Sequence, residues 1–466
     1  MKFEDVKYKL NEFWFEFKQI KSGIVGVILL IILISLLIFE KIIIPFPEAS
    51  TNWNNASYWE DNPRSVPPAW SNFFTKEKKA VSDILIPENL IINDMGRLKE
   101  FTATIEYDYD YKLPPIDLIF RFEGKGNLIF QIEVERPDGI KHLLITRREN
   151  FTEFQNVRIS IHDRAKREVF GLANQIDYAN ASMVNPEHTR PTNIIFSKAE
   201  PNMIKNITPL NGTYKFHLKV TSPGTTGELS EPKMIVVGAV SGILGTDGQK
   251  RDLWSGIVAG VRWALIIGLL TSIISVFIGV TYGVVSAFYG GIVDTIMQRI
   301  FELFISVPVL PVIIVTSAIF QPSIWLLIGI MCLFFWAGPV RTVRSIGLQI
   351  KEETYIEASK ALGAKNKRLI FKHMIPLLIP YSFASMALAV PGAIVYESTI
   401  SVIGLGDSSI VTWGQILNSA YNSGAMIQGL WWWIVPPGLM IALVGMTFAF
   451  VGFAMDKILL PKLKTR

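Results

Sequence analysis

The stretch GIVGVILLIILISLLIF at residues 23–39 carries no charged side chain and is long enough for one membrane-spanning helix. A second apolar region lies near the other end of the chain, where residues 408–455 contain no Asp, Glu, Lys or Arg. Residues 46–240 differ from both, because charged residues, turn residues and alternating apolar positions recur there. The sequence therefore predicts an α-helical membrane protein with one large polar insert.

The apolar segments predict six transmembrane helices, at about 20 residues for each crossing of the bilayer. Their approximate bounds are 23–44, 257–288, 296–320, 324–344, 377–400 and 431–455. The first segment also resembles a signal peptide, but it is long and has no clear cleavage site, so we expect an uncleaved anchor. Three domains follow from this pattern: 1–45 with the first helix, 46–240 as the insert, and 241–466 as a five-helix core.

Basic residues flank these segments and predict the orientation, since loops rich in Lys and Arg stay in the cytoplasm. They precede the first span and follow the last one, at Lys2, Lys7, Lys9, Lys18, Lys21, Lys457, Lys462, Lys464 and Arg466. The loop 341–376 is also basic, whereas 401–430 has no Lys or Arg. We expect a multi-pass protein of the cell (plasma or inner) membrane with both termini in the cytoplasm. The net charge of +5 then needs no nucleic-acid partner.

The outward-facing insert is predicted to be rich in β-strands. Apolar residues recur at every second position in five runs, at 101–111, 118–122, 130–134, 157–161 and 214–220. The turn Pro137-Asp138-Gly139 predicts a hairpin, and strands separated by Gly, Pro and Asn favour a sandwich over a barrel. All five Asn-x-Ser/Thr sequons lie in this insert, at Asn55, Asn150, Asn180, Asn206 and Asn211. Their placement agrees with an outer location, if the host glycosylates.

The basic loop holds a short pattern that suggests a docking element. Thr354 and Glu357 fit a capping box at the start of a short helix, and Gly363 can supply the positive φ that ends it. Lys365, Lys367, Arg368 and Lys372 then line a second helix, which is predicted to enter the membrane at Pro376. From the residues alone, an ordinary interfacial hairpin is the favoured interpretation of the pattern.

The segment EASKALGAKNKRLIFKHMIPLLIP at 357–380 resembles the signature of binding-protein-dependent ABC importer permeases. Ser359, His373 and Ile375 depart from the usual residues, and the His resembles the dipeptide, oligopeptide and nickel class. Further stretches resemble that class: GTDGQKRD at 245–252 with Lys250 in place of Gly, YGGIVD at 289–294, ESTISVIGLG at 397–406, TWGQIL at 412–417 and WWWIVPPGLMIAL at 431–443. The resemblance covers about 1–45 and 240–466, but not 46–235.

The resemblance implies that this chain is the C-type half of a heterodimeric pore for dipeptides or oligopeptides. Implied partners are a B-type permease, two cytoplasmic ATPase subunits and an outer substrate-binding protein. The chain has no phosphate-binding G-x-x-x-x-G-K-[ST] loop, so we expect no enzyme activity and no cofactor here, with ATP and Mg held by the ATPase subunits. The residues expected to couple to the ATPase are Glu357, Ala358, Ser359, Gly363, Lys367, Arg368 and Pro376.

Glu397 and Ser398 are candidates for the translocation pathway, because an ionisable residue within a span is often functional. A carboxylate bonded locally near the helix end is the competing interpretation. The five His residues lack metal-ligand spacing, and the lone Cys332 lies in an apolar run, so no metal site is expected.

Alternative functions are the import of oligosaccharides or nickel by the same type of transporter, or, in a different class, a membrane-anchored extracytoplasmic sensor. Residues 46–235 are predicted to fold independently and to guide or hold the substrate-binding protein. A protective spacer without that role is the alternative for this insert.

Overall fold

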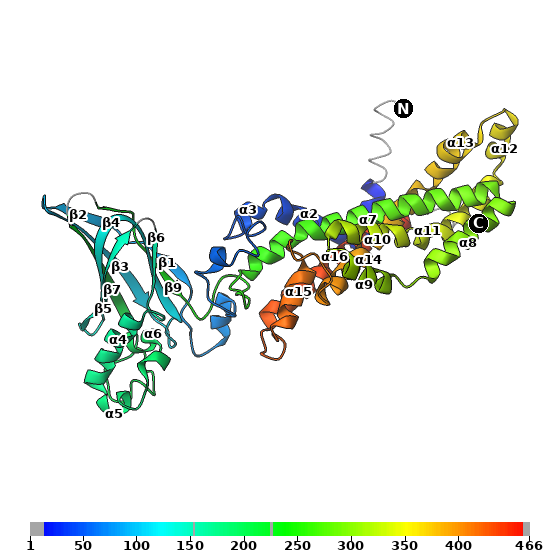
Figure 1. The fold of residues 1–466 in the computed structure, drawn as a ribbon. Helices are drawn as coiled ribbons and strands as arrows, with labels where there is room; N and C mark the ends of the chain where they lie inside the picture. Colours follow the sequence, from blue (N-terminus) through cyan, green and yellow to red (C-terminus); the bar gives the residue numbers. More distant parts are fainter. Residues whose placement is uncertain (1–13, 152–153, 224–226, 460–466) are drawn as a thin grey trace. The chain divides into compact units, whose positions relative to one another are not determined.

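The computed structural model describes residues 14–151, 154–223 and 227–459. The chain forms two compact units, one made of 1–54 with 255–466 and the other of 55–254. The first is helical and the second contains the strands (Figure 1). Several basic residues used to predict the orientation, namely Lys2, Lys7, Lys9, Lys462, Lys464 and Arg466, lie outside the described residues.

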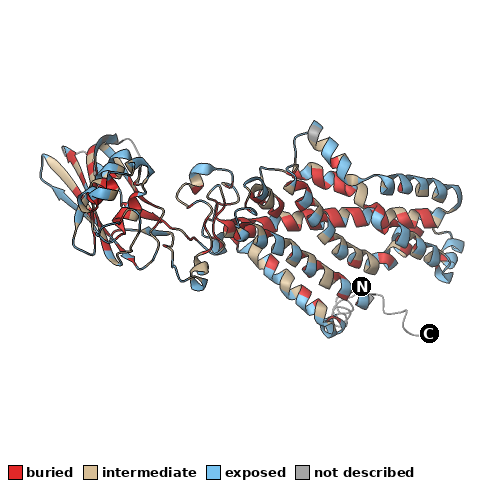
Figure 2. Cartoon of the chain, turned by 90° about the horizontal axis from the view of Figure 1, so that it is seen from below, coloured by how far each residue is buried: buried red, intermediate tan, exposed pale blue. Residues whose placement is uncertain are grey.

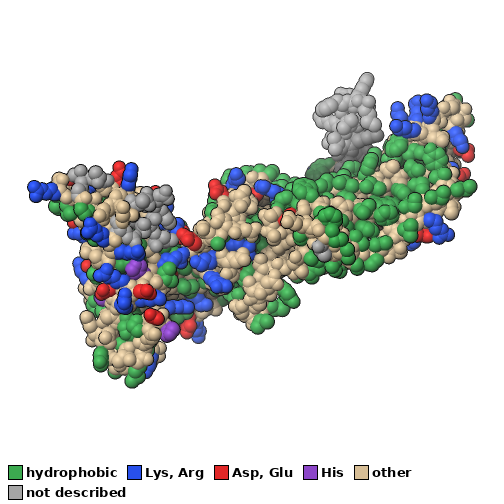
Figure 3. All heavy atoms as spheres, in the orientation of Figure 1, with side chains coloured by type: hydrophobic (Ala, Val, Ile, Leu, Met, Phe, Trp, Pro, Cys, Tyr) green, Lys and Arg blue, Asp and Glu red, His purple; other side chains and the backbone are tan. Residues whose placement is uncertain are grey.

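The helical unit is built from long apolar helices joined by short turns. Its helices are α2 (Lys21–Ile38), α3 (Glu40–Ile43), α7 (Leu253–Tyr289), α8 (Gly291–Ser306), α9 (Val309–Ile319), α10 (Ile324–Phe335), α11 (Ala337–Lys351), α12 (Thr354–Ala361), α13 (Asn366–Arg368), a π-helix (Leu369–Met374), a 3-10 helix (Ile375–Leu378), α14 (Ile379–Val402), α15 (Trp413–Asn422) and α16 (Trp431–Leu459). Apolar side chains cover much of its visible surface, as expected for a protein surrounded by lipid (Figure 3).

Among the described residues, five helical segments are long and apolar enough to cross a membrane. They are Lys21–Ile38, Leu253–Tyr289, Ile324–Lys351, Asn366–Val402 and Trp431–Ile458. The predicted third span, 296–320, is not one helix: it is the pair α8 and α9, which differ in direction by 67°. Pro308 lacks a backbone N–H and disfavours helical geometry at Val307, which is extended at ψ 121°. Counting this bent pair as one span gives six.

The other unit is a sheet of nine strands built around one long strand. The strands are β1 (Asp83–Leu85), β2 (Leu90–Asp94), β3 (Leu98–Tyr109), β4 (Asp117–Glu135), β5 (Lys141–Phe151), β6 (Phe154–Arg158), β7 (Gly212–Pro223), β8 (Glu228–Leu229) and β9 (Lys233–Val237). The first half of β4 pairs with β6 and β9, and its second half pairs with β5 and β7, all antiparallel. The predicted sandwich is therefore replaced by two half-sheets that share β4.

Strand β4 joins two runs that the sequence suggests are separate strands, 118–122 and 130–134. Gly124 and Gly126 lie between them, and Gly126 has φ +98°, so the strand continues through a backbone conformation that suits glycine. Side chains of both half-sheets share one core, in which Phe120 and Phe216 have ring centroids 5.7 Å apart. The predicted 137–139 hairpin is confirmed, with Gly139 at φ +81° and Glu135 paired with Lys141.

The same unit also contains helices and 3-10 turns, which the sequence pattern did not predict. They are α4 (Asp163–Ile176), α5 (Tyr178–Ala181), α6 (Pro191–Ile195) and three 3-10 turns at Ala56–Trp59, Ala69–Phe74 and Pro186–His188. Ala165, Val169 and Leu172 on α4 belong to the core shared with the strands. Figure 2 shows buried residues on both the strands and these helices.

The strand-containing unit extends past residue 240, because the segment after β9 is bonded to the segment before β1. The backbone N–H of Thr246 donates to Val66 O at 3.0 Å, and its hydroxyl donates to Pro63 O at 2.8 Å. Lys250 donates to Glu60 O at 2.9 Å. Residues 241–254 therefore pack with this unit.

Candidate functional site: a transmembrane cavity and a docking loop

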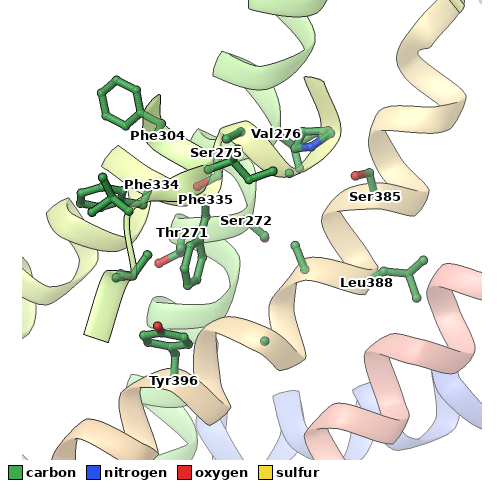
Figure 4. A pocket seen from close by; sticks show the side chains of 18 of the residues that line it. Thr271, Ser272, Ser275, Val276, Phe304, Phe334, Phe335, Ser385, Leu388 and Tyr396 are labelled. Carbon is green, nitrogen blue, oxygen red and sulfur yellow. The ribbon is translucent and has the colours of Figure 1, made fainter. Parts of the chain in front are cut away.

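The helical unit contains a cavity of about 530 Å³ between α7, α8, α10, α11 and α14 (Figure 4). Its lining residues are Thr271, Ser272, Ser275, Val276, Phe304, Ile305, Val307, Val309, Phe334, Phe335, Ala337, Gly338, Pro339, Tyr381, Ser385, Leu388, Ala389, Gly392 and Tyr396. A volume of this order is typical of sites for small ligands.

The cavity lining combines neutral hydroxyl groups with aromatic rings. Thr271, Ser272 and Ser275 lie on one face of α7, and Ser385 and Tyr396 come from α14. The rings of Phe335 and Tyr396 meet edge to face at 5.3 Å. None of the described residues that line the cavity is Asp, Glu, Lys, Arg, His or Cys. Such a surface can hydrogen-bond a ligand without favouring either sign of charge.

Helix α12 begins one residue earlier than a Thr354 cap requires. Its N-cap is Glu353, and no side chain bonds the first turn, so the predicted Thr354–Glu357 capping box is wrong. Thr354 already has helical geometry, whereas a capping residue must stay outside the helix. Glu357 instead lies in the first turn, where a negative charge is favoured by the helix dipole.

Gly363 ends this region with φ +83°, which confirms the predicted left-handed corner. The backbone N–H of Ala364 reaches Ser359 O at 3.1 Å, and that of Gly363 reaches Lys360 O at 3.0 Å. These bonds satisfy carbonyls that a helix end leaves free. The corner depends on the backbone alone, since within the part of the chain that the structure describes no atom lies within 4 Å of the position of a Cβ at Gly363.

Most of α12 is exposed and its attachment is narrow. Ile356 is its only buried residue and packs with Val343 on α11 and Ile370 in the π-helix. Glu357 and Ala358 are exposed, and Ser359 is half-buried with its hydroxyl on Tyr355 O. The basic residues that follow are also exposed, at Lys365, Lys367, Arg368 and Lys372. Lys and Arg gather over α12 and α13 in Figure 3.

Pro376 does not begin a new helix. The run from Asn366 to Val402 is continuous, but a π-helix and a 3-10 helix interrupt its α-helical bonding. Pro376 and Pro380 cannot donate backbone hydrogen bonds, which accounts for irregular geometry at this point. Pro376 is exposed and lies at the first turn of the 3-10 helix.

Glu397 and Ser398 are buried and do not line the cavity, although Tyr396 beside them does. The Glu397 carboxylate accepts from Ser401 Oγ at 2.7 Å, Thr412 Oγ1 at 2.8 Å and Ser398 Oγ at 3.3 Å. Thr412 is also the N-cap of α15. The carboxylate thus joins α14 to the start of α15, as in the competing interpretation, but through side-chain hydroxyls.

The structure therefore separates the predicted site residues into two groups. Glu357, Ala358, Ser359, Gly363, Lys367, Arg368 and Pro376 all lie in the 353–376 loop, whereas Glu397 and Ser398 lie near the other end of α14. Sequence reasoning missed the cavity residues. A signal was present in Thr271, Ser272 and Ser275, whose hydroxyls interrupt an apolar span at helical spacing.

These features define a polytopic membrane protein with an open cavity between its helices and an exposed loop. Residues 279–465 match the family described as "Binding-protein-dependent transport system inner membrane component". The dipeptide transport system permease protein DppC of Bacillus subtilis is 35% identical over 221 residues, 47% of this chain and 68% of that protein. The oligopeptide transport system permease protein OppC of Haemophilus influenzae is 32% identical over 219 residues, which are 47% of this chain and 70% of that protein.

The chain belongs to this family and is an ABC importer permease of the dipeptide/oligopeptide class. A solved chain from inward-facing conformations of the MetNI methionine ABC transporter matches 46% of this chain and 98% of its own, with 19% identity and a TM-score of 0.34, which is too low to support an argument. The family match begins at residue 279 and so excludes the unit 55–254.

Proposed function

We propose that this chain forms half of a translocation pathway for dipeptides and oligopeptides, paired with a related B-type permease. The single observation that carries the cargo assignment is the cavity lined by hydroxyls and aromatic rings. A peptide offers backbone donors and acceptors whatever its sequence, and hydroxyl groups can serve as either partner. The named relatives, which transport dipeptides and oligopeptides, support the same cargo.

The exposed 353–376 loop is proposed as the docking site of one of two cytoplasmic ATPase subunits. The second ATPase subunit would dock on the B-type permease half. Glu357 places a negative charge in the first turn of α12, and the small residues of α12 would permit close approach of an ATPase subunit. The basic residues after Gly363 offer positive charge to the same subunit. With this loop in the cytoplasm, both termini are also cytoplasmic. When the two ATPase subunits bind ATP and close on each other, they would switch the two permease halves between an inward-open and an outward-open state.

The alternative cargoes fit the cavity less well. Nickel favours nitrogen and sulfur ligands, and the described lining residues include no His or Cys. Sugars also bind hydroxyl and aromatic groups, so oligosaccharides need an experimental test. A sensor would have no use for the exposed helix α12, in which Ile356 is the one buried residue.

The test is to purify the complex with its ATPase subunits, reconstitute it with the substrate-binding protein, and add peptides, oligosaccharides or nickel separately. We expect ATP hydrolysis to rise with peptides alone. Stimulation by sugars or nickel would reject the cargo assignment, and failure of the ATPase subunits to copurify would reject the docking assignment.

A further inference from the structure

Helix α8 carries an ordered row of contacts that the proposed coupling does not yet explain. Its less exposed residues are spaced along one face, at Asp294, Met297, Gln298, Phe301 and Phe304. This spacing of three or four residues places them on one side of an α-helix. The opposite side is exposed and carries Ile296, Ile300 and Leu303.

Near the start of α8, Asp294 forms a two-point ion pair with α11. Arg344 Nε donates to Asp294 Oδ1 at 2.8 Å, and Arg344 Nη2 donates to Oδ2 at 2.5 Å. Ser286 on α7 also donates to Asp294, and Gln298 donates to Ser286 Oγ at 3.0 Å. A planar guanidinium bound through two nitrogens fixes orientation as well as distance.

Further along α8 the contacts continue toward the cavity. Tyr282 on α7 donates to Met297 O at 2.5 Å, and the Arg341 guanidinium lies 5.3 Å from the Phe301 ring centroid. Phe304 packs 5.3 Å from Trp336, between centroids, and itself lines the cavity. The row therefore begins at an ion pair and ends in the cavity wall.

Helices α7 and α11, which this row of α8 residues contacts, pack closely against each other. They approach so closely that a Cβ at Gly283 would lie 2.9 Å from Val343 Cβ, and one at Gly347 would lie 2.9 Å from Ala287 Cβ. Helix α11 leads directly into α12, whose one buried residue, Ile356, belongs to the same apolar cluster as Val343. Displacement of α12 would thus act on α11 as well as on the π-helix.

We propose that the Asp294–Arg344 pair is a transmission latch, which makes α8 follow α11 when the ATPase subunits move the 353–376 loop. The latch carries the motion to Phe304 and Ile305 in the cavity wall. Asp294 and Arg344 are positioning residues that touch neither cargo nor ATP. This inference rests on the proposed docking of the ATPase subunits.

The test uses the complete transporter with Cys332→Ala and a reporter, Ile305→Cys, in the cavity wall. Labelling of the reporter by a thiol reagent is compared with and without a non-hydrolysable ATP analogue, together with transport per ATP hydrolysed. In Asp294→Asn the nucleotide response should disappear and transport per ATP should fall at least about fivefold, the lower end of the usual coupling between sites. Asp294→Glu should restore much of both.

The matched control lies on the exposed side of the same helix. Arg299 and Glu302 also form an ion pair, at 2.7 Å, but both side chains are exposed, at 75% and 51%. Glu302→Gln should leave the labelling response and the transport ratio unchanged. If Asp294→Asn and Glu302→Gln change the labelling response and the transport per ATP equally, or if Asp294→Asn keeps both at the normal level, the proposed latch is wrong. A reporter that ignores nucleotide with the latch intact would instead contradict the proposed function.

Discussion

Glu397 shows how one carboxylate can hold two elements together. It is buried, and it accepts three hydroxyl donors from Ser398, Ser401 and Thr412. Glycines permit this closeness, since a Cβ at Gly414 would lie 2.6 Å from Ser401 Cβ. A sequence reveals an acidic residue within an apolar span, but it does not reveal whether neighbouring side chains donate hydrogen bonds to the carboxylate.

The first prediction follows from this cluster. Glu397→Ala leaves buried hydroxyls without their acceptor and should destabilise the protein by about 2 kcal/mol, seen as a lower melting temperature of the purified complex. Glu397→Gln retains a carbonyl acceptor and should be milder. Ser398→Ala, which loses only the 3.3 Å bond, is the control. Normal stability with altered peptide selectivity in Glu397→Ala would favour the pathway role predicted from sequence.

Gly392 offers a direct test of the cavity. It lines the cavity on α14, and no atom of the described residues lies within 4 Å of the position of a Cβ there. Gly392→Phe should therefore fill the cavity without disturbing the helix packing, and peptide uptake should fall at least about tenfold, the effect of losing ~1.4 kcal/mol of transition-state stabilisation.

The control for Gly392→Phe is Gly438→Phe on α16. Gly438 is equally free of close neighbours but does not line the cavity. Its uptake should stay normal. If both variants transport equally well, peptides do not pass through this cavity.

At the scale of elements, the loop around α12 should depend on its corner as much as on its charge. Gly363→Val places a β-branched residue at φ +83°, which costs about 1–2 kcal/mol or more, so α12 should end differently and peptide uptake should be lost. Glu357→Lys should also block uptake, because it reverses the exposed charge. The measurement is uptake together with copurification of the ATPase subunits.

Gly429 provides the matched control for backbone strain. It has φ +71°, has no neighbour within 4 Å of a Cβ position, and lies far along the chain between α15 and α16. Gly429→Val should retain the ATPase subunits. Loss of those subunits in Gly429→Val but not in Gly363→Val would contradict the docking assignment.

Helix α2 packs on α16 through glycine. A Cβ at Gly26 would lie 2.9 Å from Phe450 Cβ, and one at Gly23 would lie 2.7 Å from Ala454 Cβ. Small residues permit such close packing of membrane helices. Gly26→Ile should therefore destabilise the complex by about 1–3 kcal/mol, as overpacking does. Val25→Ile, on the exposed side, should not change the melting temperature.

The elements that the sequence predicts well are those defined by local pattern. The predicted spans 257–288 and 431–455 lie within α7 and α16, because hydropathy is a property of neighbouring residues. The bend at Val307 could have been anticipated from Pro308. Helix α4 was missed although Ala165, Val169 and Leu172 have helical spacing, because the surrounding residues are largely polar. The cavity and the Asp294–Arg344 pair depend on contacts between distant segments, which no local pattern records.

At the scale of the whole molecule, residues 55–254 form a unit that the family match does not include. Their core is continuous from the strands to α4 and α6, so the unit has the internal packing of a separate domain. Removal of only 50–235 would leave 241–252 without the partners at 60–66 that they bond. A cleaner deletion removes the entire unit.

The deletion can be closed by a short linker. Trp53 packs against Gly256, where a Cβ would lie 2.3 Å from the indole ring. The two points of the helical unit between which residues 55–254 are inserted therefore lie close together. We propose that the unit holds the substrate-binding protein at the pore. Replacing 55–252 by a few Gly and Ser residues should retain the ATPase subunits and peptide-independent ATP hydrolysis. Affinity for the substrate-binding protein should fall about tenfold or more, a loss of ~1.4 kcal/mol, measured by titration against the purified complex. Unchanged affinity would show that the unit is a spacer, since the remaining helices would then supply the whole docking surface.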